Sequence, residues 1–445
     1  MDARRLAWKL SLREDEYPTR LFGRAADEAG LSPQDKAFAR ELLGGVLRRR
    51  RSLDAVIAAY AKGRVTDPRL RAALRLGLYQ LLFLRGVPPH AALHGTLEAV
   101  KPECTPRIGF LNGLLRAVQR GVKREEPPVD GRARDRMPAG AWSLRFDRAV
   151  LADPQTRLAG WLADAWSQPE SLTHRWLQAS DEETTLARVQ AFDRPAPLGL
   201  RVNPLRASRE SVLEALARAG VSAAAGEHPQ HLRVTEPAGG VAALPGFHEG
   251  HWSVQDASAL DAIALAAPQP GERVLDLCAA PGGKSFAVYE ACGGDVEVLA
   301  CDTHPARLER MEAERARLGH DSVRTMRVDA EQPAPEGPWN LVICDVPCSN
   351  TGVLHKRPEA RWRFSAQTLR EAVAGQDLLR KRQLLPVLGP ATRVLWTTCS
   401  LEPEENEQAV ERLARHSGLS IADARLFEPD ATRSGGFAAL LVPEA

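Results

Sequence analysis

The chain has 445 residues, of which 44% are hydrophobic and 26% charged, a composition typical of a folded protein with two to three domains. No apolar run approaches the roughly 20 residues needed to cross a bilayer, and the first residues lead into an amphipathic helix rather than a signal peptide. These observations argue against a membrane protein, and we expect a cytoplasmic one.

The distribution of charge is uneven, although the net charge is only +2. Residues 1–124 contain 24 Lys and Arg against 12 Asp and Glu, whereas the remainder of the chain is acidic. A basic first domain is typical of proteins that bind a polyanion. A solvated basic surface is the alternative, and charge alone does not decide between the two.

The seven cysteines include no CxxC pair. An odd number of cysteines without such pairs argues against a disulfide framework and against a structural zinc site, so we expect no metal. Most of the cysteines are predicted to be small buried hydrophobic residues, and a chemical role for any of them needs its own argument.

Residues 1–122 are predicted to be entirely helical, because apolar residues recur at helical spacing, for example in 42–47, 53–60 and 74–84. The arginines of 48–51 lie between two apolar stripes and are expected near a helix end, where they complement the helix dipole. Four consecutive side chains fan around a helix and cannot all serve one flat surface. This segment resembles the RNA-binding domain of the antitermination factor NusB in residues 40–47 (RELLGGVL), 74–82 (LRLGLYQLL), 87–92 (VPPHAA) and 109–116 (GFLNGLLR).

A charged, proline-rich stretch around 123–137 lacks apolar periodicity and is predicted to be a linker, which places a helical domain at 1–125 and the linker at 126–142. The next part is mixed. It has a helical segment at 161–166, an alternating strand at 198–203, a helix at 209–219 and short strands, so we expect a small α+β module at 143–245. Its Arg201-x-Asn203 pair resembles the Arg-x-Asn signature that precedes the catalytic domain of RNA cytosine methyltransferases.

After Gly271 strands and helices alternate, which predicts a doubly wound, Rossmann-like parallel sheet within a domain at 246–445. The strands have continuous apolar runs, as in a sheet covered on both faces. In this topology we expect the strand at 341–346 and the last strand to flank the first. The predicted strands are 273–278, 297–302, 323–329, 341–346 and 393–398, and the predicted helices are 305–318, a long helix ending near Leu388, and 404–416.

The first of these strands leads into a loop that is suited to a ligand, Asp276 to Lys284 (DLCAAPGGK). Small residues let a ligand approach the backbone, and Asp302 ends the next strand, where an acid grips ribose hydroxyls. The dinucleotide fingerprint GxGxxG is absent, and a phosphate-binding P-loop would need glycine where Cys278 stands. S-adenosylmethionine fits best, and a loop that only packs helix on sheet is the alternative. The candidate cofactor residues are Cys278 (through its backbone), Ala279, Ala280, Pro281, Gly282, Gly283, Lys284, Asp302 and, more weakly, Arg307, which is nearly as well explained as part of a solvated helix face.

Two further strand ends carry thiols, Cys348 after Asp345-Val346-Pro347 and Cys399 after the last strand. If both face one pocket, a thiolate can add to C6 of a cytosine and make C5 nucleophilic, which is covalent catalysis. Asp345 can assist by hydrogen bonding or protonating N3, and the second thiol can assist removal of the C5 proton. The alternatives are a buried strand-end thiol, an acid that caps a turn and a surface lysine at 284.

Residues 276–284, 345–352 and 398–406 (TCSLEPEEN) resemble motifs I, IV and VI of the RNA 5-methylcytosine methyltransferases, and residues 253–258 resemble the element that leads into their catalytic domain. The resemblance implies that Cys399 is the nucleophile, that Cys348 assists release and that Asp345 contacts the target base and the cofactor. Asp302 and Asp329 fall on the family's ribose-side and adenine-side acids. With the NusB-like segment, the match narrows to the RsmB (Sun/Fmu) type, which methylates a cytosine of small-subunit ribosomal RNA.

The chain departs from the family pattern at Val346, where alanine is usual, and at Asn350, where a small residue is common. Both are expected to affect fit rather than mechanism. The segment 435–441 lacks the usual acidic and final basic residues, which leaves RNA contacts there in doubt. We expect a monomer that binds small-subunit ribosomal RNA. A transfer-RNA cytosine-C5 methyltransferase and a catalytically silent RNA-binding assembly factor remain as alternatives.

Overall fold

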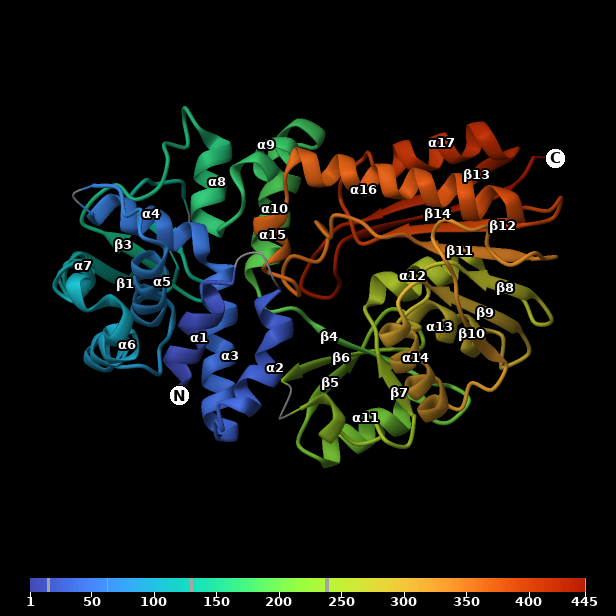
Figure 1. Ribbon diagram of the computed structural model, residues 1–445, viewed down its shortest axis with the longest axis horizontal. Coiled ribbons are helices and arrows are strands. Elements are labelled where there is room, and N and C mark those ends of the chain that lie inside the picture. The colour runs from blue at the N-terminus through green and yellow to red at the C-terminus, as the bar shows by residue number, and fades with distance from the viewer. Residues whose placement is uncertain (14–16, 62, 129–130, 237–239, 445) are drawn as a thin grey trace. The chain divides into compact units, whose positions relative to one another are not determined.

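The computed structural model describes all residues except 14–16, 62, 129–130, 237–239 and 445 (Figure 1). The chain forms two compact units. Unit 1 consists of residues 1–194 together with Leu354–Ser365, and unit 2 consists of Pro195–Val353 and Ala366–Ala445. These cuts fall at other positions than the predicted boundaries after residues 125, 142 and 245. A short segment from within the C-terminal part of the sequence returns to unit 1.

The first part of unit 1 is helical, as predicted, and its helix starts follow the sequence closely. Asp67 caps α5 by accepting a hydrogen bond from Arg69 N–H at 2.9 Å, and Pro68 occupies the first turn, where its missing N–H costs nothing. A Cβ on Gly77 would lie 2.8 Å from Leu115, so this glycine lets two helices pack closely. The helices are α1 (Ala3–Ser11), α2 (Pro18–Glu28), α3 (Pro33–Arg48), α4 (Arg50–Tyr60), α5 (Pro68–Phe83), α6 (Pro89–Cys104) and α7 (Ile108–Gly121).

The arginine run lies at the junction of α3 and α4, as predicted, and it is used for internal ion pairs. Arg49 is buried and its guanidinium lies 2.6 Å from the carboxylate of Asp193. Arg51 pairs with Asp164 at 2.8 Å and with Glu170 at 2.7 Å. Part of the positive charge of the first domain is therefore neutralised within unit 1.

The stretch predicted to be a linker, 126–142, contains a short strand, β2 (Arg136–Pro138). β1 (Val122–Glu125) and β2 both pair with β3 (Ser143–Phe146) in an antiparallel sheet of order β1-β3-β2. A strand as short as β2 shows no alternation in the sequence. Unit 1 is completed by α8 (Leu158–Trp166), α9 (Glu170–Ala179), α10 (Glu182–Asp193) and the short α15 (Ala360–Arg363).

Unit 2 begins with a small antiparallel sheet of order β5-β6-β4-β7. Helix α11 packs on it around a core that includes Leu200, Leu216, Leu232 and Trp252. The mixed α+β pattern predicted from the sequence is confirmed for this part of the chain. The elements are β4 (Leu198–Val202), α11 (Arg209–Arg218), β5 (Ser222–Ala225), β6 (His231–Glu236) and β7 (Trp252–Val254).

The larger sheet of unit 2 has seven strands in the order β10-β9-β8-β11-β12-β14-β13. The five strands predicted from the sequence are parallel, but β14 runs antiparallel to β12 and to β13, so the sheet is mixed rather than purely parallel. The strands are β8 (Arg273–Asp276), β9 (Glu297–Asp302), β10 (Val323–Arg327), β11 (Leu341–Asp345), β12 (Arg393–Thr398), β13 (Leu419–Phe427) and β14 (Gly436–Pro443).

Helices cover both faces of this sheet (Figure 1), which explains the continuous apolar strands. One core lies under α12 (Ala257–Ala266), α13 (Gly283–Ala291) and α14 (Pro305–Leu318), and the other lies under α17 (Glu407–Ser417). The long helix expected before Leu388 is α16 (Ala366–Leu379), followed by a π-helical turn (Arg380–Leu384) and a 3-10 turn (Leu385–Val387). No helix in the described part of the chain is long and apolar enough to span a membrane.

Candidate active site

The loop after β8 allows a ligand to approach its backbone closely. Gly282 has φ +104°, and a Cβ added there would lie 2.4 Å from the ring of Phe286, so only glycine fits without displacement. The N–H of Ala279 donates to the carbonyl of Cys301 at 2.9 Å and ties the loop to β9. The predicted cofactor residues 278–284 thus lie together at the carboxyl end of β8 and the start of α13.

A buried acid stands at the base of this loop. Asp276, the last residue of β8, is 0% exposed and accepts a hydrogen bond from the hydroxyl of Ser285 at 2.7 Å on Oδ2. Its Oδ1 has no hydrogen-bond partner among the described residues. Burial raises the pKa of Asp276 to about 7. A buried acceptor that lacks a donor suits a ligand with an ammonium group, such as the amino-acid end of S-adenosylmethionine.

The structure brings Asp302 and Arg307 to the same loop. Asp302 ends β9, is 3% exposed, and pairs with Arg307 through Nη1 and Oδ2 at 3.1 Å. Arg307 also donates to the carbonyl of Ala280. Arg307 therefore links the acid to the cofactor loop, while its side chain stays 45% exposed on the solvated face of α14.

Asp329 occupies a different environment from Asp302. It is exposed, follows β10, and accepts a hydrogen bond from the N–H of Glu331 at 3.0 Å. The preceding N–H, of Val328, donates to Asp302 O at 3.2 Å. Within the described residues no hydrogen bond or ion pair joins the Asp329 carboxylate to the cofactor loop, so its role rests on the resemblance alone.

Lys284 and Asp345 form an ion pair between the cofactor loop and the end of β11. Lys284 Nζ lies 2.7 Å from Asp345 Oδ2, and the hydroxyl of Thr397 donates to Asp345 Oδ1 at 2.9 Å. Burial lowers the pKa of Lys284, but the charge and hydrogen bond of Asp345, with Asp276 and Cys399 nearby, outweigh it and leave that pKa raised. Lys284 is therefore a partly buried cation, 14% exposed and paired with Asp345, rather than a fully solvated surface lysine.

The two thiols predicted to face one pocket lie against each other. Cys348 Sγ and Cys399 Sγ are 3.1 Å apart, and both side chains are partly exposed. A hydrogen bond from the N–H of Gly352 to the carbonyl of Cys399, 3.0 Å long, joins the two loops. The hydrogen bond to Cys399 raises the pKa of Cys348 well above its ordinary value, reinforced by burial and by the charges of Cys399 and Glu405.

The strand order differs from the sequence-based prediction at this point. β8 is flanked by β9 and β11, and β12 lies beyond β11, so the last strand does not border the first. The thiols still meet, because β11 and β12 are parallel neighbours with Asp345 opposite Thr397 and their exits adjoin. Three further cysteines, Cys278, Cys301 and Cys344, lie near the loop. Cys301 and Cys344 are fully buried in the sheet, and burial raises the pKa of all three thiols.

Several residues of this site were not anticipated from the sequence. Asn350, with φ +63°, accepts a hydrogen bond from the thiol of Cys399 at 3.3 Å and donates to the carbonyl of Cys348 at 2.7 Å. It was expected to affect fit only. Glu405 contacts Ser349, the neighbour of Cys348. The one sequence signal for Asn350 was that asparagine adopts the left-handed backbone conformation more readily than most other non-glycine residues.

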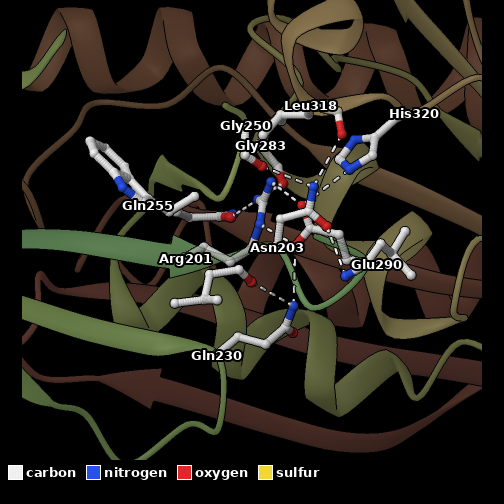
Figure 2. Close-up of polar contacts among 12 residues, drawn as sticks. Arg201, Asn203, Gln230, Gly250, Gln255, Gly283, Glu290, Leu318 and His320 are labelled. Carbon is white, nitrogen blue, oxygen red and sulfur yellow. Dashed lines mark hydrogen bonds and ion pairs between the residues drawn. The ribbon is translucent and has the colours of Figure 1, made fainter. Parts of the chain in front are cut away.

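The Arg-x-Asn pair joins the small sheet to the part of unit 2 that contains the larger sheet (Figure 2). Arg201 on β4 is fully buried, donates to both carboxylate oxygens of Glu290 on α13 at 2.8 and 3.0 Å, and reaches Gly283 O at 2.7 Å. It also donates to the side chain of Gln255. Asn203 donates to the carbonyls of Gly250 and Leu318 at 3.2 and 3.1 Å. The signature thus supports the start of α13 from beneath the cofactor loop.

A Rossmann-like sheet with this loop is the fold of the S-adenosylmethionine-dependent methyltransferases, and comparison with known proteins agrees. Residues 262–444 match the model of the 16S rRNA methyltransferase RsmB/F family, residues 3–120 match the NusB family, and residues 168–239 match the RsmF/B-like ferredoxin-like domain. The part of the chain that the structure describes contains no cluster of three or more His, Cys, Asp and Glu residues suited to a metal ion.

Curated relatives cover most of the chain. A protein of Synechocystis sp. named probable ribosomal RNA small subunit methyltransferase B is 33% identical over 407 residues, 90% of this chain and 85% of that protein. The ribosomal RNA small subunit methyltransferase B of Citrobacter koseri is 34% identical over 412 residues, 91% of this chain and 85% of that protein. The chain therefore belongs to the ribosomal RNA small subunit methyltransferase B family.

Solved structures agree on the fold. The crystal structure of PH0851 has a TM-score of 0.75 and 22% identity, and the match covers 99% of both chains. The crystal structure of NSun6 from Pyrococcus horikoshii with SFG has a TM-score of 0.55 and 18% identity over 62% of this chain and 98% of that one. The predicted helical N-terminal part, small α+β module and Rossmann-like part are thus confirmed.

Proposed function

We propose that this chain transfers a methyl group from S-adenosylmethionine to C5 of a cytosine in 16S ribosomal RNA, with Cys399 as the nucleophile. The observation that carries the proposal is the pair of thiols 3.1 Å apart at two neighbouring strand exits. Beside them lies the ion pair of Asp345 with Lys284, which is part of the cofactor loop. A protein that only binds RNA has no use for this arrangement.

The residues present suit the cofactor. The loop 278–283 provides close backbone approach, Oδ1 of Asp276 is a buried acceptor that lacks a donor among the described residues, and Asp302 and Arg307 are held at the loop. When bound, S-adenosylmethionine supplies an electrophilic methyl group. We assign Asp302 and, by resemblance alone, Asp329 to its ribose and adenine side, and we place its amino-acid end at the glycine turn.

The two thiols have different parts in the reaction. Cys399 loses its proton to solvent and adds as a thiolate to C6 of the cytosine. N3 takes up a proton in this step and donates it in a hydrogen bond to the carboxylate of Asp345, which Lys284 and Thr397 hold in place. Cys348 keeps its proton in the free enzyme because its pKa is raised by the hydrogen bond to Cys399, by burial and by neighbouring charge. Once the sulfur of Cys399 is a neutral thioether, its charge no longer raises the pKa of Cys348, which favours loss of the Cys348 proton to solvent.

Release follows from the same geometry. The thiolate of Cys348 takes the proton from C5 of the methylated base, the C5=C6 double bond re-forms, and the C6–S bond breaks with Cys399 leaving as a thiolate. N3 returns its proton to solvent. Two thiols are needed because one of them is bonded to the ring when the proton must be removed. The target cytosine must be unstacked to reach the site, which costs a few kcal/mol and least in a loop or bulge.

The test uses wild type, Cys399→Ala and Cys348→Ala with unmodified 16S ribosomal RNA and radiolabelled S-adenosylmethionine. We expect wild type to label C5 of one cytosine and Cys399→Ala to lose transfer. Cys348→Ala should form a methylated covalent RNA–protein adduct that persists on a denaturing gel. Normal transfer by Cys399→Ala would contradict the covalent mechanism.

The same assay separates the alternatives. Label in transfer RNA but not in 16S ribosomal RNA would replace the proposed substrate while keeping the chemistry. RNA binding by wild type without methyl transfer to either RNA would favour the assembly factor.

A further inference from the structure

The turn that carries Cys348 is held in place by two buried side chains from other parts of the sequence. The residue before Cys348 is held through its carbonyl, because Gln376 on α16 donates from Nε2 to Pro347 O at 2.9 Å. The residue after it is held twice by Glu405. Ser349 donates to this carboxylate from its backbone N–H at 2.9 Å and from its hydroxyl at 2.5 Å.

Glu405 is the centre of this arrangement. It lies in the loop between β12 and α17, is 0% exposed, and accepts a further hydrogen bond from Gln376 at 3.1 Å. Its own carbonyl accepts from the indole N–H of Trp396 on β12 at 3.2 Å, so the loop is anchored to the sheet. A carboxylate is the one side chain that can accept from all three donors at once. Burial raises the pKa of Glu405, and the hydrogen bonds from Ser349 and Ser400 oppose that rise.

The two thiols depend on Glu405 to different degrees. Glu405 also accepts a hydrogen bond from Ser400, the residue after Cys399. Cys399 has further support, because it directly follows β12 and its backbone carbonyl is fixed by Gly352 N–H at 3.0 Å. Cys348 lies in the segment after β11 that has no regular hydrogen-bonding pattern. Its flanking residues are fixed by Glu405 and Gln376. Removing Glu405 should therefore displace Cys348 more than Cys399.

From this geometry we propose that Glu405 is a positioning residue that holds Cys348 against the reacting carbon during release. The proposal rests on the proposed function, because it assumes that Cys348 removes the C5 proton. At that step the sulfur of Cys348 must point at the C5–H bond while the Cys399 sulfur is still bonded to C6. A thiol that is out of position slows proton removal and leaves the C6–S bond intact.

The test compares Glu405→Ala and Glu405→Gln with wild type, and Glu411→Ala, an exposed carboxylate on α17, serves as the matched control. In a single turnover with 16S ribosomal RNA and labelled S-adenosylmethionine, Glu405→Ala should form the methylated covalent adduct at the wild-type rate. Its turnover should fall by about 100-fold, the range in which a positioned acid or base contributes. The adduct should then accumulate as the main species.

The conservative variant distinguishes positioning from charge. In Glu405→Gln the amide oxygen can still accept from Ser349 N–H and Gln376, and the amide N–H can donate to the Ser349 hydroxyl. We expect turnover close to wild type and no accumulated adduct. If the Glu405→Ala protein does not fold, Gln376→Leu removes the hydrogen bond to Pro347 O without introducing a cavity, and it should show the same stalled adduct.

Two results would overturn the inference. Glu405→Ala and Gln376→Leu that release RNA as fast as wild type would show that Cys348 needs no such support. A parallel loss of adduct formation and turnover, in protein with an unchanged melting temperature, would show that the contact serves attack by Cys399 as much as release. Neither result touches the proposed function, which is tested separately by methyl transfer with wild type and Cys399→Ala.

Discussion

At the scale of single residues, Asp276 makes stability depend on pH. The ordinary pKa of an aspartate is 3.8, and burial raises that of Asp276 to about 7 in the folded chain. Between these values the folded state binds more protons than the unfolded state, so the free energy of unfolding falls as pH rises from about 4 to about 7 and is flat above. This is the opposite of the behaviour of an aspartate that is stabilised in its charged form.

The variant Asp276→Asn keeps the shape of the side chain and an acceptor for the Ser285 hydroxyl, but it cannot ionise. The free energy of unfolding of the variant minus that of wild type should be larger at pH 8 than at pH 5. The reason is that only wild type must bury a charge above pH 7. The melting temperatures of both proteins at the two pH values measure this. A wild-type-minus-variant difference that is the same at pH 5 and pH 8 would contradict the raised pKa.

The residues of the proposed active site were predictable from the sequence where recognisable motifs contain them. The cysteines at 348 and 399, the acid at 345 and the loop at 278–284 were all predicted, because each lies at or shortly after the end of an apolar strand. The parts played by Asn350 and Glu405 were not predicted. Each acts on a loop far from it in the sequence, and no local pattern reports which loops meet.

At the scale of elements, the contact of β4 with α13 rests on a buried ion pair. Arg201 and Glu290 have side chains that are 0% exposed, and the nearby His320 lies 3.3 Å from Glu290 (Figure 2). Removing one partner of such a pair leaves an uncompensated buried charge, which costs about 3–5 kcal/mol. Arg201→Met should therefore lower the melting temperature of the protein strongly.

The same variant should weaken binding of S-adenosylmethionine, because Arg201 also holds the carbonyl of Gly283 at the cofactor loop. Isothermal titration at a temperature where the variant is folded measures the affinity. The double variant Arg201→Met with Glu290→Met removes both charges and should recover much of the stability but not the affinity. Full recovery of affinity would mean that the network only stabilises the fold.

Element boundaries were predicted well where strands are buried and poorly at the edge of the sheet. β9, α14 and β12 begin and end at the predicted residues. β13 was not predicted, because as an edge strand it is mostly exposed, with polar residues such as Ser420 and Asp423, and lacks a continuous apolar run. The antiparallel pair it forms with β14 was therefore missed as well.

At the scale of the whole molecule, the segment Leu354–Ser365 makes unit 1 depend on the catalytic part of the sequence. Arg361 in this segment is 0% exposed and donates to the carbonyls of Arg48, Ser167 and Phe192 at 3.1, 2.9 and 3.3 Å. Trp362 donates to Leu47 O at 2.8 Å. These contacts join residues more than 160 positions apart, so no local pattern indicates them and the predicted domain boundaries do not include them.

A shortened chain tests this dependence directly. A chain of residues 195–445 keeps unit 2 but removes the Arg48, Ser167 and Phe192 carbonyls that Arg361 contacts. It also exposes Leu354, which is 0% exposed in the complete chain. A buried side chain of this kind contributes about 1.5–3 kcal/mol when covered, and exposed apolar patches promote aggregation. We expect this chain to be poorly soluble, whereas the same chain with 354–365 replaced by a Gly/Ser linker of equal length should be soluble and bind S-adenosylmethionine. Soluble yield and titration calorimetry compare the two, and equal solubility and affinity would show that unit 2 does not need the segment covered.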